Sequence, residues 1–443
     1  MDITLKSWLA DPLLDVMNFL NEVVLRYPQA VSFAPGRPSE QCFDVEHSLG
    51  SAAVWVESRA AASGVPPRRI WNDLGQYNRT NGIINDLISR QLAADEGIAA
   101  APESIIVTTG CQEGMAILLL GLIDPATDAL LVSDPAYIGI PGLAKIMGLT
   151  LLPVPTGERG LDPEEVRRAV GEARRMGRRP RALYDVPDFN NPLGTRMPVE
   201  ARHALLDLAR EEEMLIWEDN PYGMFCYDGQ PLPTLKALDE HGVVVYMGSF
   251  SKTLYPGLRL GYLIADQGVV LASGQRVPLA AELSKIKSLT TINTSPVVQA
   301  MAGGLLLEMG CTLRPAVAEK LPFYRGNRDR MLAALEDTLG GLEGVCWNRP
   351  EGGFFLTLTL PFEINDDQLE ACARDYGVIV CPMRFFALAP GRERQVRLSF
   401  SYVSPEQIDI GISRLARFVR DQAAASPAVL TQPPLRSGEE RAG

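Results

Sequence analysis

One lysine stands in a segment whose neighbouring residues could bind a phosphate group. The segment covers residues 249–261 (SFSKTLYPGLRLG) and follows the apolar run VVVYM at 243–247. Lys252 is preceded by Ser249 and Ser251, and Arg259 follows it in the same segment. A lysine amine can bond covalently to the carbonyl of a cofactor, while hydroxyls and an arginine can hold a phosphate. Alone, the pattern would describe an exposed lysine in a loop, because most lysines are exposed.

An acid and a tyrosine occur together in residues 217–222 (WEDNPY). An acid at the end of a buried strand can pair with the protonated nitrogen of a pyridine ring, and this keeps the ring an electron sink. We expect Asp219 to have this role. Tyr222 could reach a phenolic oxygen on the same ring. The alternative is an Asx turn ahead of Pro221, which needs no cofactor.

The segment TGCQE at residues 109–113 connects a strand-like run to the start of a helix. Backbone N–H groups at such a junction bind phosphate, and here Gly110, Cys111 and Gln112 would supply them. An ordinary helix-capping loop is the alternative. A catalytic thiol at Cys111 is disfavoured because no histidine lies near it in the sequence.

Two further side chains could contact the same ring. The amide of Asn191, in NNPLG at residues 190–194, could donate to the phenolic oxygen. Tyr137, in DPAYIG, could stack on the face of the pyridine. The alternatives are turn formation for the asparagine and plain packing for the tyrosine.

These residues fall at the ends of strand-like runs that alternate with helical patterns. The strand-like runs are residues 104–108, 129–132, 151–152, 182–186, 214–217 and 243–247, and the helical stretches are 113–122, 163–175 and 198–212. Alternation of this kind predicts an α/β fold with a mostly parallel sheet. Ligands of such sheets bind beyond the carboxyl ends of the strands, which is where the candidate residues lie.

The pattern changes after about residue 322. Residues 324–339 and 404–422 have helical patterns, 354–360 (FFLTLTL) alternates like a half-buried strand, and 395–400 is another strand. We therefore predict a smaller C-terminal α+β domain. The expected division is an N-terminal arm at 1–50 that contributes to the small domain, a large α/β domain at 51–322, the small domain at 323–424, and a disordered tail at 425–443 rich in Pro, Ser and charge.

Composition excludes several classes of function. The chain has 443 residues and a net charge of −12 without a basic stripe, which argues against nucleic acid and anionic membranes as partners. The three histidines lie far apart, so no metal site is expected. The seven cysteines form no CxxC pair, and the acidic N-terminal stretch does not resemble a signal peptide. These features predict a cytoplasmic enzyme whose cysteines are reduced.

Taken in order, the motifs resemble those of class I/II aminotransferases, fold-type I enzymes that use pyridoxal 5′-phosphate (PLP). The resemblance runs from about residue 32 to 418. It implies a seven-stranded type of sheet in the large domain and makes Lys252 the Schiff-base residue. The other PLP contacts that it implies are Asn191, Asp219, Tyr222, Ser249, Ser251, Arg259 and the stacking Tyr137.

The resemblance also implies a substrate site and a homodimer with shared active sites. Arg397, in VRLSFS, would bind the α-carboxylate of an amino acid or 2-oxo acid, and Gly36, in SFAPGRP, would lie beside it. Tyr77 would reach the phosphate in a neighbouring subunit, and the loop at 292–296 would also cross the interface. Lys252 would transfer the α-proton as general acid and base.

The substrate is less well defined by the sequence. The segments at 11–40, 76–83 and 186–194 resemble 4-hydroxyphenylglycine and 3,5-dihydroxyphenylglycine transaminases, which implies antibiotic biosynthesis. Many family members have GGLP where this chain has PGRP, so Arg37 adds a charge near the substrate entrance. It could bind an acidic or phosphate-bearing substrate group or take part in a surface ion pair. Two rival functions stay open: a PLP-dependent elimination, replacement or C–C bond formation, and a regulator with an aminotransferase-like domain.

Overall fold

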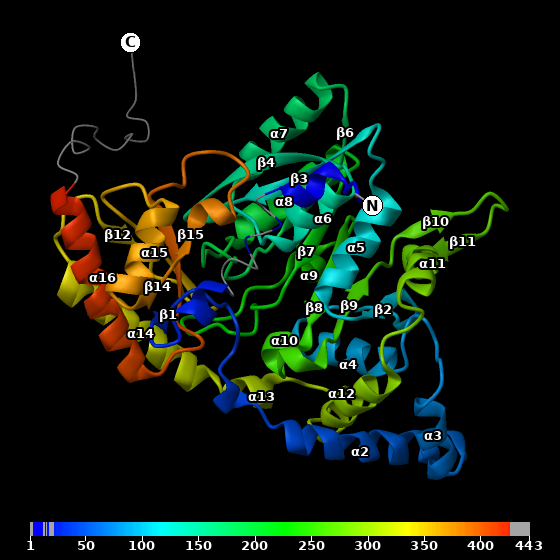
Figure 1. Cartoon of the computed structure of the whole chain (residues 1–443). Helices are drawn as coiled ribbons and strands as arrows, with labels where there is room; N and C mark the ends of the chain where they lie inside the picture. Colours follow the sequence, from blue (N-terminus) through cyan, green and yellow to red (C-terminus); the bar gives the residue numbers. More distant parts are fainter. Residues whose placement is uncertain (1–2, 12–13, 15, 17–21, 426–443) are drawn as a thin grey trace.

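A computed structural model describes residues 3–11, 14, 16 and 22–425 (Figure 1). The large sheet has eight strands in the order β2-β9-β8-β7-β6-β3-β4-β5. Strands β4, β3, β6, β7 and β8 run parallel, and β9, β2 and β5 are antiparallel to their neighbours. Their bounds are β2 Ile105–Thr108, β3 Asp128–Asp134, β4 Thr150–Gly157, β5 Gly160–Leu161, β6 Arg179–Asp185, β7 Leu215–Asp219, β8 Val244–Ser249 and β9 Gly261–Ile264.

Helices cover both faces of this sheet because successive residues of its buried strands point to opposite sides. In β3, Leu130 packs in a core that includes α5, whereas Leu131 packs in a second core with α7 and α8. The helices of this part are α2 Val45–Ser63, α3 Pro67–Leu74, α4 Asn85–Asp95, α5 Cys111–Leu122, α6 Gly139–Ile146, α7 Pro163–Arg175, α8 Val199–Glu211, α9 Leu235–Leu238, α10 Phe250–Thr253, α11 Leu279–Thr290, α12 Pro296–Glu308 and α13 Arg314–Ala318. A hairpin of β10 Gly268–Val270 and β11 Arg276–Pro278 lies at the edge (Figure 1).

The described C-terminal part has an antiparallel sheet in the order β12-β13-β16-β15 and three α-helices, with a short 3-10 helix at Met383–Phe385. The bounds are β12 Cys346–Trp347, β13 Phe355–Thr359, β14 Val378–Ile379, β15 Cys381–Pro382, β16 Gln395–Ser399, α14 Leu321–Leu339, α15 Asp366–Asp375 and α16 Pro405–Ala425. The N-terminal strand β1, Val31–Ser32, pairs with β14. In Figure 1 these elements lie to the left of the large sheet, and β1 lies among them, below β14. After β1, the chain therefore passes from the C-terminal part to the part that contains the large sheet.

The predicted fold class is confirmed: a large, mostly parallel sheet is followed by a smaller antiparallel sheet. The two-residue β5 makes the large sheet eight-stranded instead of seven-stranded. Strand β13 is more buried than its alternating pattern predicts, because its second face packs on the loop at 190–194, where Thr357 Oγ1 donates to the carbonyl of Leu193 at 3.3 Å. The domain boundaries stay predictions.

Parts of the chain near its two ends are not described by the structure. The predicted disordered tail lies outside the described residues apart from residue 425, and part of the N-terminal stretch does too. Among the described helices, none has the length and apolar character needed to cross a membrane.

Candidate active site

A cavity of about 730 Å³ opens at the carboxyl ends of β7 and β8 and is bordered by residues of both parts. Its walls contain all but one of the residues that the sequence singled out. These are Gly36, Arg37, Gly110, Cys111, Gln112, Tyr137, Asn191, Asp219, Tyr222, Ser249, Ser251, Lys252, Arg259 and Arg397. Tyr77 is absent from the walls, and its side chain is 78% exposed.

Lys252 lies on the short helix α10, directly after β8. Ser249 caps this helix, because its Oγ accepts a hydrogen bond from Ser251 N at 3.1 Å. The Lys252 amine donates to the carbonyl of Gly36 at 2.9 Å. Burial, reinforced by the charges of Arg397 and Arg259, lowers the pKa of Lys252 to about 8. A lowered pKa makes the neutral amine more available for attack on a carbonyl carbon.

Asp219 ends the buried strand β7 and is 4% exposed. The hydroxyl of Tyr184 donates to its Oδ2 at 2.8 Å, whereas Oδ1 has no hydrogen-bond partner among the described residues. Burial raises the pKa of Asp219 to about 6, although the Tyr184 hydroxyl opposes the shift. A buried acceptor without a partner is costly. The free oxygen therefore fits the N–H of a protonated pyridine ring.

The first turn of α5 forms one end of the cavity. Gly110 precedes the helix with a φ of 74°, and no side chain caps the helix there. A side chain at this position would meet Arg259, since a Cβ would lie 2.8 Å from a guanidinium nitrogen. The backbone N–H groups of Cys111 and Gln112 in the first turn of α5, the hydroxyls of Ser249 and Ser251 and the Arg259 cation together fit a phosphate group.

Arg397 lies on β16 at the opposite wall and is 5% exposed. Its Nη1 donates to Asn191 Oδ1 at 2.6 Å, and its Nη2 donates to the carbonyl of Ala34 at 2.5 Å. The rings of Phe355 and Phe386 lie 4.4 and 4.6 Å from its guanidinium carbon. Arginine in this setting can bind a carboxylate through two parallel hydrogen bonds. Because Asn191 accepts through its oxygen, its amide N–H₂ stays available as a donor.

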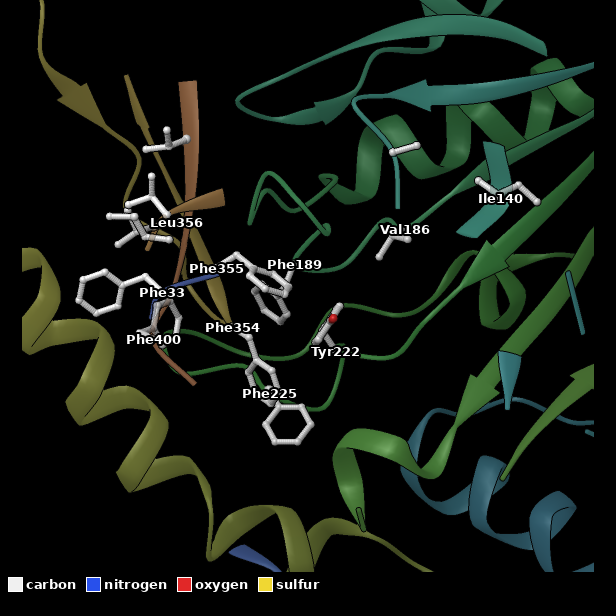
Figure 2. Close-up of a cluster of buried hydrophobic side chains, with 14 of the residues drawn as sticks. Phe33, Ile140, Val186, Phe189, Tyr222, Phe225, Phe354, Phe355, Leu356 and Phe400 are labelled. Atoms are coloured by element: carbon white, nitrogen blue, oxygen red, sulfur yellow. The ribbon is translucent and has the colours of Figure 1, made fainter. Parts of the chain in front are cut away.

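Two tyrosines border the centre of the cavity. Tyr222 packs edge-on against Phe354 and Phe355 at 5.4 and 5.6 Å, and Figure 2 shows it beside this aromatic cluster. Burial raises the pKa of Tyr222, so the hydroxyl stays protonated and can donate. The hydroxyl of Tyr137 lies 3.4 Å from Gln112 Oε1, which directs its ring into the cavity wall.

The two segments predicted to cross a dimer interface lie next to each other at the surface. Asn78 N, beside Tyr77, donates to Asn293 Oδ1 at 3.4 Å. Ile292 in the second segment is 46% exposed. Tyr77 is therefore an exposed residue near the 292–296 loop and does not line the cavity.

Some residues of the site were not found from the sequence. Tyr184 is a member of a predicted strand, yet its contact with Asp219 depends on the pairing of β6 with β7. Phe355 and Phe386 flank Arg397 from separate segments, and the ring of Tyr402 contacts Arg37. Phe355 could have been found from its place in the predicted strand at 354–360. In the structure β13 pairs with β16, and Thr357, two residues after Phe355, lies opposite Arg397.

The cavity as a whole fits PLP. Its walls carry a lysine amine, a carboxylate with a free oxygen, the group of phosphate donors described above, and hydroxyl and amide donors. These are the groups that a pyridine aldehyde with a phosphate arm requires.

Comparisons with known proteins agree with this geometry. The family model for aminotransferase class I and II matches residues 80–415. The (S)-3,5-dihydroxyphenylglycine transaminase of Amycolatopsis orientalis is 44% identical over 94% of each chain. Aromatic-amino-acid aminotransferase 1 of Thermococcus litoralis is 29% identical over 88% of each chain. The kynurenine aminotransferase of Pyrococcus horikoshii, solved with PMP, superposes with a TM-score of 0.80 at 27% identity, covering 95% of this chain and 97% of that one.

Proposed function

Because the chain belongs to the class I and II aminotransferases, a family of PLP-dependent enzymes, we propose that it transfers an amino group between an arylglycine and a 2-oxo acid. The amino acid loses its α-amino group and becomes a 2-oxo acid, while the second 2-oxo acid gains that group and becomes an amino acid. The arylglycine assignment rests on the 44% identity to the dihydroxyphenylglycine transaminase, and with it we propose a role in antibiotic biosynthesis.

The observation that carries the cofactor assignment is the placement of the Lys252 amine and the unpartnered Asp219 oxygen on the walls of one cavity. We propose that Lys252 binds PLP covalently and Asp219 holds its ring nitrogen protonated. Bound PLP supplies an electron sink for the bond broken at the α-carbon. Tyr222 and Asn191 would donate hydrogen bonds to the phenolic oxygen of the ring, and Tyr137 would pack on the ring.

The phosphate is held at the other end of the cavity. Its proposed donors are the backbone N–H groups from Gly110 to Gln112, the hydroxyls of Ser249 and Ser251, and Arg259. Cys111 contributes its backbone and not its thiol: burial raises the pKa of that thiol well above its usual range, so it is not a thiolate.

The substrate is oriented from the small-domain side. Arg397 exchanges its present acceptors, Asn191 Oδ1 and the Ala34 carbonyl, for the α-carboxylate of the substrate. The backbone of Gly36 lies beside that carboxylate, where a side chain would collide with the Phe355 ring at 2.4 Å. The apolar walls at Val16, Val24, Leu25 and Ile138 offer a surface for an aryl ring.

Lys252 is then placed to carry the proton. The free amine of Lys252, whose pKa is lowered to about 8, would accept a proton from the α-carbon of the substrate. The same amine would then be placed to return that proton within the site.

We further propose that the enzyme works as a homodimer in the cytoplasm. Tyr77 and Ile292 are exposed in the single chain and come from segments that contact each other, which supports a role for them at a partner's active site. The seven cysteines are free thiols, as is usual in a reducing compartment.

The proposal is tested by mixing PLP-loaded enzyme with arylglycines, aromatic amino acids and acidic amino acids. We expect the cofactor spectrum to convert toward pyridoxamine phosphate, with the matching 2-oxo acid identified by mass spectrometry. Release of ammonia, or a product with a new C–C bond, without the pyridoxamine form would support the rival PLP reactions instead.

A further inference from the structure

Lys320 is a buried lysine whose amine holds the backbone directly after Lys252. Its residue is 9% exposed, and its Nζ donates to the carbonyl of Thr253 at 2.5 Å and to that of Leu254 at 3.0 Å. Lysines are seldom buried, because desolvation of the charge is costly, and burial lowers the pKa of Lys320. Lys320 does not line the cavity, so the proposed reaction leaves this amine without a role.

The helix that carries Lys252 is short and needs support at both ends. Helix α10 has four residues, Phe250–Thr253, and a single helical turn is unstable by itself. Ser249 caps its first turn through the hydrogen bond from Ser251 N. At the other end, the last carbonyls of a helix have no N–H partner within the helix, and a lysine side chain can bond to them. Lys320 does this for α10, immediately after Lys252.

The two carbonyls belong to the connection between the antiparallel strands β8 and β9. Phe250 N donates to the carbonyl of Leu260 at 3.1 Å and closes this connection at its base. Farther along, the backbone leaves regular structure, and Arg259 has a left-handed φ of 48°. Lys320 therefore restrains the stretch of chain that joins Lys252 to Arg259, the proposed phosphate ligand.

Lys320 is itself fixed by the C-terminal part of the chain. It stands directly before α14, Leu321–Leu339, and its carbonyl accepts from Tyr324 N at 3.3 Å. The ring of Tyr324 is fully buried, and its centre lies 4.7 Å from that of Phe354, a member of the aromatic cluster in Figure 2. Figure 1 shows α13, which precedes Lys320, below α10. The amine thus fastens the helix of Lys252 to a well-packed element of the other part.

We propose that Lys320 is a positioning residue for Lys252: its two hydrogen bonds hold the end of α10 so that the Lys252 amine stays within reach of the α-carbon of the substrate. The inference rests on the proposed aminotransferase function and adds a residue from outside the cavity walls. A proton moves between heavy atoms only within hydrogen-bond reach. Displacement of a reacting group by about 1 Å can slow a reaction on the order of a hundredfold.

The test uses three variants of the PLP-loaded enzyme. Lys320→Met retains a flexible side chain of similar length without N–H donors, and Lys320→Arg retains donors. Lys236→Met is the matched control, because Lys236 is also buried and donates to the carbonyl of Val244 at 3.1 Å. Val244 begins β8, whereas Lys252 follows the end of that strand. Both methionine variants should unfold at lower denaturant concentration, but only Lys320→Met should affect Lys252.

Hydrogen exchange followed by mass spectrometry examines the anchor without any substrate. The amide of Leu254 donates to the carbonyl of Phe250 at 2.9 Å and reports on the end of α10. We expect peptides that cover residues 250–260 to exchange roughly tenfold faster in Lys320→Met, as the loss of a buried donor implies. Exchange of the same peptides should be native in Lys236→Met and close to native in Lys320→Arg.

Single turnovers then compare an amino acid that the native enzyme converts with the same amino acid carrying deuterium at its α-carbon. Lys320→Met should slow the conversion on the order of ten- to a hundredfold and leave the concentration for half-maximal conversion unchanged. The deuterium isotope effect should increase, because proton transfer by Lys252 becomes the slowest step. Lys320→Arg should recover most of the rate, and Lys236→Met should retain the native rate and isotope effect. A loss of stability alone would not change the isotope effect.

A native isotope effect or native exchange of residues 250–260 in Lys320→Met would overturn the role of Lys320, and so would equal changes in Lys236→Met. If Lys320→Met does not fold, Lys320→Gln takes its place, since its single amide can bond one of the two carbonyls; it should give the same changes at smaller size, and their absence would overturn the role. A native enzyme that converts another amino acid but no arylglycine would contradict the proposed substrate, while the Lys320 comparison is made with the amino acid that reacts.

Discussion

Tyr184 donates a hydrogen bond of 2.8 Å to one carboxylate oxygen of Asp219 and leaves the other oxygen without a partner. The contact joins neighbouring parallel strands, β6 and β7, near their carboxyl ends. It fixes the rotation of the carboxylate, so that the free oxygen has one defined direction for a ring N–H. The contact also stabilises the charged form of Asp219, which a protonated ring nitrogen requires.

Replacing Asp219 with Asn should slow the amino-transfer half-reaction on the order of a hundredfold or more, because an amide cannot hold the ring nitrogen protonated. The covalent link between PLP and Lys252 should persist, so the visible absorbance of the loaded enzyme remains. Stopped-flow half-reactions measure the rate. Glu218→Gln is the control, since Glu218 is the adjacent carboxylate but accepts backbone N–H groups of Leu235 and Lys236. A native rate in Asp219→Asn would contradict the role of the acid.

Arg397→Lys should raise the KM for every amino acid substrate by about ten- to a hundredfold with a smaller effect on kcat. A lysine cannot make the bidentate contact or fill the space beside Phe355 and Phe386. Steady-state kinetics with two substrates checks this. An unchanged KM for all substrates would show that the α-carboxylate binds elsewhere.

Asp134 at the end of β3 connects the large sheet to the loop that carries Phe386. Its carboxylate accepts from the backbone N–H groups of Leu388 and Ala389 at 2.7 and 3.2 Å, and Ala136 N donates to the carbonyl of Phe386 at 3.0 Å. Because Phe386 packs on Arg397, Asp134→Asn should raise the KM for amino acids severalfold and leave PLP affinity near the native value.

The matched control for this variant is Asp239→Asn. Asp239 also accepts backbone N–H groups, those of His241, Val243 and Val244, but it lies at the other end of β8 from Lys252. Asp239→Asn should lower the free energy of unfolding by about 1–3 kcal/mol and leave the KM for amino acids unchanged. Equal KM values in the two variants would show that Asp134 does not help to position Arg397.

The pH dependence of cofactor attachment follows from the lowered pKa of Lys252. The neutral amine reacts, and with a pKa of about 8 it becomes the major form as the pH rises through 8. The rate of PLP attachment to cofactor-free enzyme should therefore rise with pH up to about 8 and level off above it. An ordinary lysine would give a rate that still rises near pH 10. Stopped-flow absorbance distinguishes the two profiles.

Much of this site could be predicted from sequence because its main groups sit directly after strands. Lys252, Asp219 and Gly110 each follow a β-branched or aliphatic run, and parallel strands bring their carboxyl ends to one edge of the sheet. The order of the motifs then identified the family. Arg397 was assigned through the resemblance and not through any pattern of its own.

Contacts between residues far apart in the chain could not be predicted from the sequence. The partner of Asp219 is Tyr184, and the stacking partner of Arg37 is Tyr402, yet neither tyrosine stands in a motif. Their positions depend on strand register and on how the segment at 34–37 lies against the small domain. Strand β9 was likewise missed, because its four residues follow the lysine motif directly and run antiparallel to β8.

The most direct test of the account is to map the residue that carries the cofactor. Borohydride fixes the link between PLP and its lysine, and peptide mass spectrometry locates the added mass. We expect the added mass on the peptide that contains Lys252, and no visible absorbance band in Lys252→Ala. Label on a different lysine, with the band retained in that variant, would contradict it.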